Sequence, residues 1–343
     1  MTTTAAIRYS HTVGSLSNQG RGFQNPVDVA LDSQGVMYVL NRAGPELPIR
    51  LPYKRVSMCT VNEEFLGEFG TGGTGPGEFW WPSSLALDSQ DRIYVADEAM
   101  NRITVFSTEG EMLGMWGEPG SAPGYMDRPS YLALDANDNL LIADSGNHRI
   151  QRFTVEGQFL EAWGEFGDRE GQMNTPWGVA LDRDGNVYVS DWGNDRIQKF
   201  TANGDFLAEI PGAGHTVPDS HRITHPAGLC LGGHGNIYVA DWGNERVLVL
   251  SADGEVLATL RGESETPTWA DEYFLANPEE GALRLEADLS PVVDPPERRD
   301  REESANVEKL FWGPTAVKLD GHGNILVVDS CRHRIQVYRW EGH

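Results

Sequence analysis

The sequence predicts an all-β protein, a six-bladed β-propeller built from four-stranded antiparallel blades. Residues 175–210 contain four short runs that are rich in β-branched and aromatic residues, the pattern of strands. The chain repeats this segment, and six copies can be aligned along it. Six small sheets can bury both faces by packing radially around one axis, and such packing leaves only short edges.

Within the repeated segment, strands are expected at 178–181, 187–190, 197–201 and 206–210. The first and third connections, at 183–186 and 202–205, carry the Asp-Gly and Asn-Gly pairs of tight hairpins. Glycine accepts positive φ there without a Cβ clash. The middle connection, 191–196, has more elaborate side chains and is called the decorated turn below. The unit is therefore predicted to be a four-stranded meander.

Each copy begins at a proline, followed by a similar strand, hairpin and strand. The blades are expected to start at Pro26, Pro82, Pro129, Pro176, Pro226 and Pro314, which are separated by 56, 47, 47, 50 and 88 residues. The last copy ends after its third strand, so it lacks an outer strand. Residues 5–15 have the sequence character of that strand, and they are predicted to complete blade six and close the ring. Residues 1–343 then form a single domain.

Composition narrows the classes of function. The formal net charge is −24, from 27 Lys and Arg against 51 Asp and Glu, and no basic cluster is present. Phosphate contacts need such a cluster, so nucleic acid is not an expected partner. No long apolar run could cross a bilayer, and no secretory signal is visible at the start. Three cysteines at unrelated repeat positions favour a reduced setting, so we expect a soluble, cytoplasmic protein.

The long insertions are all expected on the face that carries the decorated turns. They are residues 41–54 in blade one, the link 211–226, and the span 261–311 between blades five and six. Insertions confined to one face are typical of a binding face. In 261–311, Thr268 has the spacing of a helix cap, and Asn277-Pro278 begins a second capped helix. Residues 291–303 are expected to be an exposed strap. The insertion is predicted to meet the blade-one loop above the ring, as a lid or a subunit interface that could join two copies.

A charged pair recurs in the decorated turns. An Asp is followed five residues later by an Arg in five blades, and blade one has Asn41 instead, where its long loop replaces the pair. The pairs are Asp97/Arg102, Asp144/Arg149, Asp191/Arg196, Asp241/Arg246 and Asp329/Arg334. Because a pair in nearly every blade fits a structural role, we interpret each as a bidentate tie across its turn rather than as a cation site.

The blade prolines and the (V/L)ALD, GN-(I/V)-YV and GN-x-R-(I/V) segments resemble the NHL repeat across nearly the whole chain except the insertions. The resemblance implies a propeller but no single function, because NHL propellers include RNA binders, protein-binding modules, extracellular sensors and a lyase class. The chain resembles the zinc-dependent peptidyl-α-hydroxyglycine α-amidating lyases in blade pattern. Their metal histidines follow the blade proline, and none of the six matching positions here is histidine, so that activity and its metal are not expected.

Departures from the repeat indicate where a ligand could bind. The residues before and after each blade proline begin the innermost strand, so they should surround the central opening. An aromatic rim with a few polar groups is typical of a small-molecule or peptide site. The predicted ligand-binding residues are Trp81, Arg128, Tyr131, Trp177, Trp192, His225 and Trp242. For Trp192 and Trp242, packing between blades is the alternative. Neither His148 nor His333, in matching decorated turns, is assigned a role.

Two functions remain open. The first is a binding module that takes a peptide, a protein partner or a small molecule on the loop-rich face. The second is an enzyme, a lyase or hydrolase that uses Arg128 and His225 in the same cavity, with or without a metal. No phosphate-binding loop, dinucleotide fingerprint or nucleophile elbow is present, so no cofactor is expected.

Overall fold

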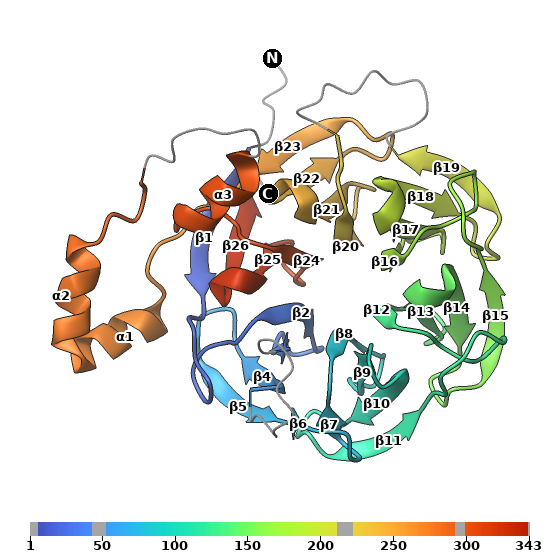
Figure 1. Ribbon diagram of the computed structural model, residues 1–343, viewed down its shortest axis with the longest axis horizontal. Helices are drawn as coiled ribbons and strands as arrows, with labels where there is room; N and C mark the ends of the chain where they lie inside the picture. Colours follow the sequence, from blue (N-terminus) through green and yellow to red (C-terminus); the bar gives the residue numbers. More distant parts are fainter. Residues whose placement is uncertain (1–5, 43–52, 211–221, 292–298, 342–343) are drawn as a thin grey trace.

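A computed structural model describes residues 6–42, 53–210, 222–291 and 299–341. Six four-stranded antiparallel sheets are arranged in a ring around a central axis, as Figure 1 shows. The innermost strands surround the axis and the fourth strands form the perimeter. The all-β, six-bladed architecture predicted from the repeats is confirmed.

The strand boundaries repeat from blade to blade. Blade one contains β2 (Pro26–Leu31), β3 (Met37–Asn41), β4 (Arg55–Cys59) and β5 (Phe65–Phe69); blade two contains β8 (Pro82–Leu87), β9 (Ile93–Asp97), β10 (Arg102–Phe106) and β11 (Met112–Trp116); blade three contains β12 (Pro129–Leu134), β13 (Leu140–Asp144), β14 (Arg149–Phe153) and β15 (Phe159–Trp163). Blade four contains β16 (Pro176–Leu181), β17 (Val187–Asp191), β18 (Arg196–Phe200) and β19 (Phe206–Ile210); blade five contains β20 (Pro226–Leu231), β21 (Ile237–Asp241), β22 (Arg246–Leu250) and β23 (Val256–Leu260). A short parallel pair, β6 (Thr71–Gly72) and β7 (Glu78–Phe79), links blades one and two.

Blade six is closed by the N-terminal strand, as predicted. It contains β24 (Pro314–Leu319), β25 (Ile325–Asp329) and β26 (Arg334–Trp340). The fourth strand is β1 (Ile7–Val13), which runs antiparallel to β26 from Ile7 opposite Trp340 to Val13 opposite Ile335. The two ends of the chain are therefore joined by a backbone ladder, which removes the open edges of the ring.

Burial follows from the radial arrangement. Second strands such as β17 are buried at every position, because blades pack on both of their faces. Fourth strands such as β15 alternate between exposed and half-buried residues, as expected for an outer strand. Aromatic residues from the third strands, including Phe106, Phe153 and Phe200, fill the spaces between neighbouring blades.

The Asp–Arg pairs lie in the decorated turns, with a geometry that differs from the expected one. In blades three to six the arginine Nε donates to the aspartate Oδ2 over 2.6 to 2.8 Å. The remaining N–H groups of these arginines donate to backbone carbonyls of the link that precedes the blade. Arg149, for example, donates to the carbonyls of Ser121 and Ala122. The predicted bidentate tie is therefore wrong, because backbone carbonyls compete for the remaining N–H groups.

Blades one and two depart further from the prediction. Arg102 donates to the carbonyls of Thr74, Gly75 and Glu78, while the Asp97 carboxylate accepts backbone N–H groups of Trp80 and Trp81. In blade one the arginine is retained after the inserted loop. Arg55 lies opposite Asn41 in the β3–β4 ladder and pairs with Glu68 at 2.7 Å, so the loop does not replace it.

One hydrogen bond recurs in all six blades. The acidic or amide side chain at the end of the second strand accepts the backbone N–H of the residue two positions before the blade proline. The acceptor and donor pairs are Asn41 with Gln24, Asp97 with Trp80, Asp144 with Asp127, Asp191 with Asn174, Asp241 with Thr224 and Asp329 with Trp312. These side chains therefore fix how the chain enters each innermost strand.

A second set of hydrogen bonds connects neighbouring blades. The residue just before the arginine of the decorated turn has positive φ in blades two to six. Its side chain accepts the N–H of the residue before the next blade's proline. The acceptor and donor pairs are Asn101 with Arg128, His148 with Thr175, Asp195 with His225, Glu245 with Gly313 and His333 with Asn25.

The two histidines in this set therefore have a structural role that the sequence did not reveal. Nδ1 of His148 and of His333 accepts its hydrogen bond, so each ring must be unprotonated at that nitrogen. Burial lowers the pKa of both imidazoles, with nearby arginines contributing, which favours this neutral form.

The insertion between blades five and six contains helices α1 (Thr268–Ala276), α2 (Pro278–Glu286) and α3 (Arg299–Asn306). The first two were predicted, but neither Thr268 nor Asn277 makes a side-chain cap. The N-cap of α1 is Pro267. The third helix occupies the end of the expected strap, and the Arg332 side chain donates to the carbonyls of Ser304 and Ala305 in its last turn.

The hairpin of α1 and α2 lies beside the ring rather than above its centre, next to β1 (Figure 1). The preceding segment crosses blade six, where Glu263 and Glu265 donate backbone N–H groups to Gln336 and Tyr9. Helix α1 then packs on blade one. The predicted contact with the blade-one loop falls on residues 43–52, which are outside the described residues.

Trp269 anchors α1 across the seam between blades six and one. It is 6% exposed, packs edge-on against Phe23 and Phe65, and donates its Nε1–H to the Glu63 carbonyl. The Glu63 carboxylate accepts the N–H groups of Gly14 and Thr268. Glu63 thus connects the end of the N-terminal strand, blade one and the insertion.

We predict that Trp269→Ala destabilises the ring by about 3 kcal/mol or more, because it removes a buried aromatic side chain and leaves the Glu63 carbonyl unpaired. Chemical denaturation measures this change. Leu275→Ala, at an exposed α1 position, is the matched control and should change stability by less than about 0.5 kcal/mol. Equal stabilities for the two variants would contradict the proposed anchoring.

Candidate functional site: an aromatic mouth

The loop-bearing face has a cavity of about 430 Å³ at the central axis, which we call the mouth. Its size lies within the range of small-molecule sites. The lining residues come from the ends of innermost strands and from decorated turns. They are Asn25, Val27, Arg42, Trp81, Trp177, Trp192, Ala227, Trp242, Thr315 and Ser330.

Four of the seven predicted ligand-binding residues line this mouth. Trp177 directly follows the proline of blade four, while Trp81 directly precedes that of blade two. Trp192 and Trp242 directly follow Asp191 and Asp241, the recurring aspartates that end the second strands of blades four and five. The two hydrogen-bond sets described above fix the backbone just before each blade proline and at the end of each second strand. These indoles are therefore placed around one opening.

The other three predicted residues lie elsewhere. Tyr131 is 1% exposed and is buried in the core, where Lys318 Nζ lies 4.6 Å from its ring centroid. The Arg128 side chain lies at the exposed rim of blade three, 3.6 Å from Asp127. His225 packs against Trp192, with ring centroids 4.2 Å apart, and edge-on towards Trp242 at 6.4 Å. It therefore supports the aromatic wall without lining the cavity.

Arg42 and Ser330 line the mouth but were missed from the sequence. Both follow the last residue of a second strand, at the same repeat position as Trp192 and Trp242. An alignment of that position gives Arg42, Glu98, Ser145, Trp192, Trp242 and Ser330. The variation at this position could have identified these lining residues from the sequence. In blade one the alignment of Arg42 is hidden, because the inserted loop begins there.

The Arg42 guanidinium lies over the Trp81 ring at 4.6 Å and faces Glu98, with 3.6 Å between Nη2 and Oε2. That separation is too long for a hydrogen bond. Arg42 Nε and Glu98 Oε2 are buried, and neither atom has a hydrogen-bond partner in the part of the chain that the structure describes. Burial lowers the pKa of Arg42 and raises that of Glu98, since each charge loses solvation that its partner only partly replaces.

Helix α3 reaches the edge of the mouth. The Arg301 guanidinium lies 4.4 Å from the Trp242 ring centroid, and its Nη1 lies 3.7 Å from Glu245 Oε1. Glu245 has a fully buried side chain, and its other oxygen accepts the Gly313 N–H. Burial raises the pKa of Glu245 to about 6, with Asp329 adding to the shift and Arg301 and Arg261 opposing it.

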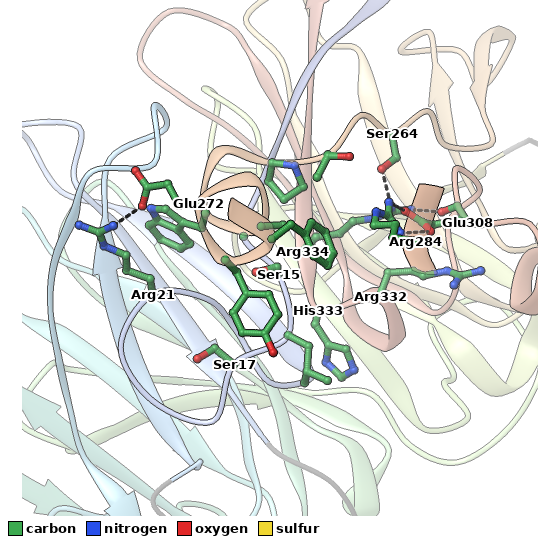
Figure 2. Close-up of a pocket in the computed structure, with 18 of the residues that line it drawn as sticks. Ser15, Ser17, Arg21, Ser264, Glu272, Arg284, Glu308, Arg332, His333 and Arg334 are labelled. Atoms are coloured by element: carbon green, nitrogen blue, oxygen red, sulfur yellow. Dashed lines mark hydrogen bonds and ion pairs between the residues drawn. The ribbon is translucent and has the colours of Figure 1, made fainter. Parts of the chain in front are cut away.

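A second cavity, of about 800 Å³, lies between the α1–α2 hairpin and the seam of blades six and one (Figure 2). Arg284 and Glu308 form an ion pair on one side, and Arg334 donates to Ser264. Tyr273 from α1 and Ser17 from the N-terminal loop also line this cavity. The hairpin thus forms its own cavity at the perimeter, and the prediction that it covers the central opening is wrong for this part of the insertion.

Among the described residues, no group of three or more His, Cys, Asp or Glu side chains could hold a metal ion. The histidine-rich link contributes His225 to the aromatic wall, while His215, His221 and Asp219 lie outside the described residues. No helix in the described parts of the chain is both long enough and apolar enough to span a membrane.

The six radial sheets with an axial mouth define this protein as a six-bladed β-propeller. Residues 79–106, 126–153, 173–200, 224–250 and 311–338 match the family model of the NHL repeat, so blades two to six each carry one match. The chain is an NHL-repeat protein, as the sequence pattern indicated.

Known proteins share parts of the sequence or the whole fold. NHL repeat-containing protein 3 of Mus musculus is 32% identical over 101 residues, which are 27% of this chain and 27% of that protein, so the chain spans about a quarter of this relative. Virginiamycin B lyase from Staphylococcus aureus, solved with quinupristin, is 14% identical (TM-score 0.57; 97% of this chain, 99% of the lyase). An auxiliary nutrient binding protein from Bacteroides ovatus is 14% identical (TM-score 0.61; 98% and 78%). At such identities the two structures show the fold alone.

We predict that Glu245 makes stability fall as pH rises. Its folded pKa of about 6 exceeds the ordinary value of 4.5, so its contribution is full below about pH 4.5 and is lost as pH rises through 6. The loss corresponds to about 2 kcal/mol. Glu245→Gln keeps an acceptor for the Gly313 N–H but cannot ionise, so the variant should gain stability relative to wild type between pH 4.5 and 7.5.

Denaturant titrations of both proteins at several pH values measure that difference. Buried carboxylates of other blades, such as Asp144 and Asp191, contribute equally to both profiles and cancel. Glu279→Gln, at an exposed position of α2, is the control and should leave the profile unchanged. Parallel profiles for wild type and Glu245→Gln would show that Glu245 does not titrate in this range.

Proposed function

We propose that this propeller is a binding module that holds a small molecule, or one side chain of a peptide or protein partner, in the mouth. The observation that carries this proposal is the convergence of four indoles from three blades on one cavity of about 430 Å³. Indole rings provide large, rigid apolar contact surfaces and are enriched where binding energy concentrates.

The repeat itself argues against a purely structural origin of this aromatic wall. At the position of Trp177, other blades carry Ser83, Ser130 and Ala227, and their strands pair in the same way. At the position of Trp192, blades three and six carry Ser145 and Ser330. Since small residues satisfy the fold at both positions, the tryptophans are not needed to build a blade.

The enzymatic alternative has less support. Its proposed pair, Arg128 and His225, belongs to blades three and five, and neither side chain lines the mouth. Arg128 interacts with Asp127 at the rim, and His225 packs on Trp192. A proton donor and acceptor must reach the same reacting atoms, and these positions do not favour that.

A cytoplasmic setting remains part of the proposal. Cys59, Cys230 and Cys331 are all free, which is the usual state of cysteines in a reducing compartment. The exposed α1–α2 hairpin is the part of the insertion that we propose for contact with a protein partner or a second copy.

Trp177→Ala should weaken ligand binding at the mouth about tenfold or more, because it removes one of the indole side chains that form the aromatic wall. Saturation-transfer NMR with a set of aromatic fragments identifies a reporter, and titration gives its dissociation constant. The melting temperature should stay nearly unchanged, since alanine occupies the same position in blade five.

Trp340→Phe, far from the mouth on the outer part of blade six, is the matched indole control. Unchanged binding in Trp177→Ala, or equal weakening in both variants, would rule out the mouth as the site. A large loss of stability in Trp177→Ala would instead mean that Trp177 belongs to the core.

A further inference from the structure

We propose that the ligand of the mouth is an amphipathic carboxylate, whose carboxylate binds Arg42 and whose flat apolar body packs on Trp177, Trp192 and Trp242. This inference rests on the proposed binding function and adds the chemical class of ligand. It follows from how charge and aromatic surface are divided between the two sides of the mouth.

The mouth has a polar side and an aromatic side. Blades one and six supply its polar groups, Asn25, Arg42, Thr315 and Ser330. Blades four and five supply Trp177, Trp192 and Trp242, and blade four stands across the axis from blade one (Figure 1). The fourth indole, Trp81 of blade two, has its ring face covered by the Arg42 guanidinium. A ligand that spans the opening therefore meets hydrogen-bonding groups at one end and indole surfaces at the other. An amphipathic molecule matches both.

The polar side is suited to an anion. Arg42 is the cation among the described lining residues, and none of those residues carries a carboxylate. Its nearest described counter-charge, Glu98, is 3.6 Å away, and Arg42 Nε has no acceptor among the described residues. The buried guanidinium is therefore incompletely compensated. A carboxylate matches the planar arrangement of guanidinium N–H groups and can accept two of them at once.

Nearby groups support this orientation. The Thr315 hydroxyl also lines the mouth, is buried, and has no hydrogen-bond partner within the described parts of the chain. A buried hydroxyl without a partner costs free energy that a ligand oxygen could recover. A cationic ligand would instead meet Arg42 directly, although tryptophan cages otherwise favour cations. The faces of Trp81 and Trp242 are already approached by Arg42 and Arg301.

The test compares two probes of nearly equal shape on the whole chain, hippurate and its neutral amide N-benzoylglycinamide, by isothermal titration calorimetry. We expect hippurate to bind about tenfold more tightly than the amide. The double variant Arg42→Gln/Glu98→Gln should lose that preference while keeping the binding of the amide. Replacing both partners avoids leaving one buried charge unpaired.

Arg21→Gln removes an exposed positive charge at the perimeter, where Arg21 pairs with Glu272, and should keep the full preference for hippurate. Trp177→Ala should weaken both probes alike. Equal binding of the two probes by wild type, or a preference that survives in the double variant, would overturn the carboxylate assignment but leave the binding function intact. If neither probe binds and the fragments above also fail, the binding function itself is wrong.

Discussion

The structure depends on one repeated hydrogen bond, in which the side chain that ends each second strand accepts the N–H group two residues before the blade proline. Five of these side chains are buried aspartates and one is Asn41. Burial raises the pKa of Asp144, Asp191, Asp241 and Asp329 even though hydrogen bonds and arginines oppose the shift. The fold thus retains buried charge because these carboxylates organise backbone that the strand ladders do not reach.

This constraint explains why variation at the mouth is tolerated. It fixes the backbone immediately before the blade proline and at the end of the second strand, using only the Asp or Asn side chain. The residues just beyond these points, such as Trp177, Trp192 and Arg42, therefore take no part in the bond that positions them. Each blade can change its contribution to the opening without changing its own architecture.

The sequence predicted the features that local repetition determines. Turn residues and strand patterns recur six times, so blade number, strand positions and the closing strand could be inferred from them. Four mouth tryptophans could also be inferred, because they depart from the repeat. Tyr131 could not be excluded, since its position in the repeat does not reveal that its side chain is buried in the core. Arg42 was missed because the inserted loop hides its alignment with Trp192.

The placement of the insertion required contacts between residues that are distant in sequence. Helix propensity located α1 and α2, but the hairpin is positioned by Trp269 and Glu63, which are 206 residues apart. That contact lies on the seam between blades six and one, and Glu63 also binds the N–H of Gly14 just after the closing strand β1, so the hairpin stabilises the closure rather than covering the opening. Helix α3 is held separately, through Arg332 on its carbonyls and Arg301 beside Glu245 and Trp242. The insertion therefore has two separate roles. Its first half stabilises the perimeter of the ring, and its last helix, α3, lies at the edge of the mouth. Changes at Arg301 can therefore alter the site without weakening the ring.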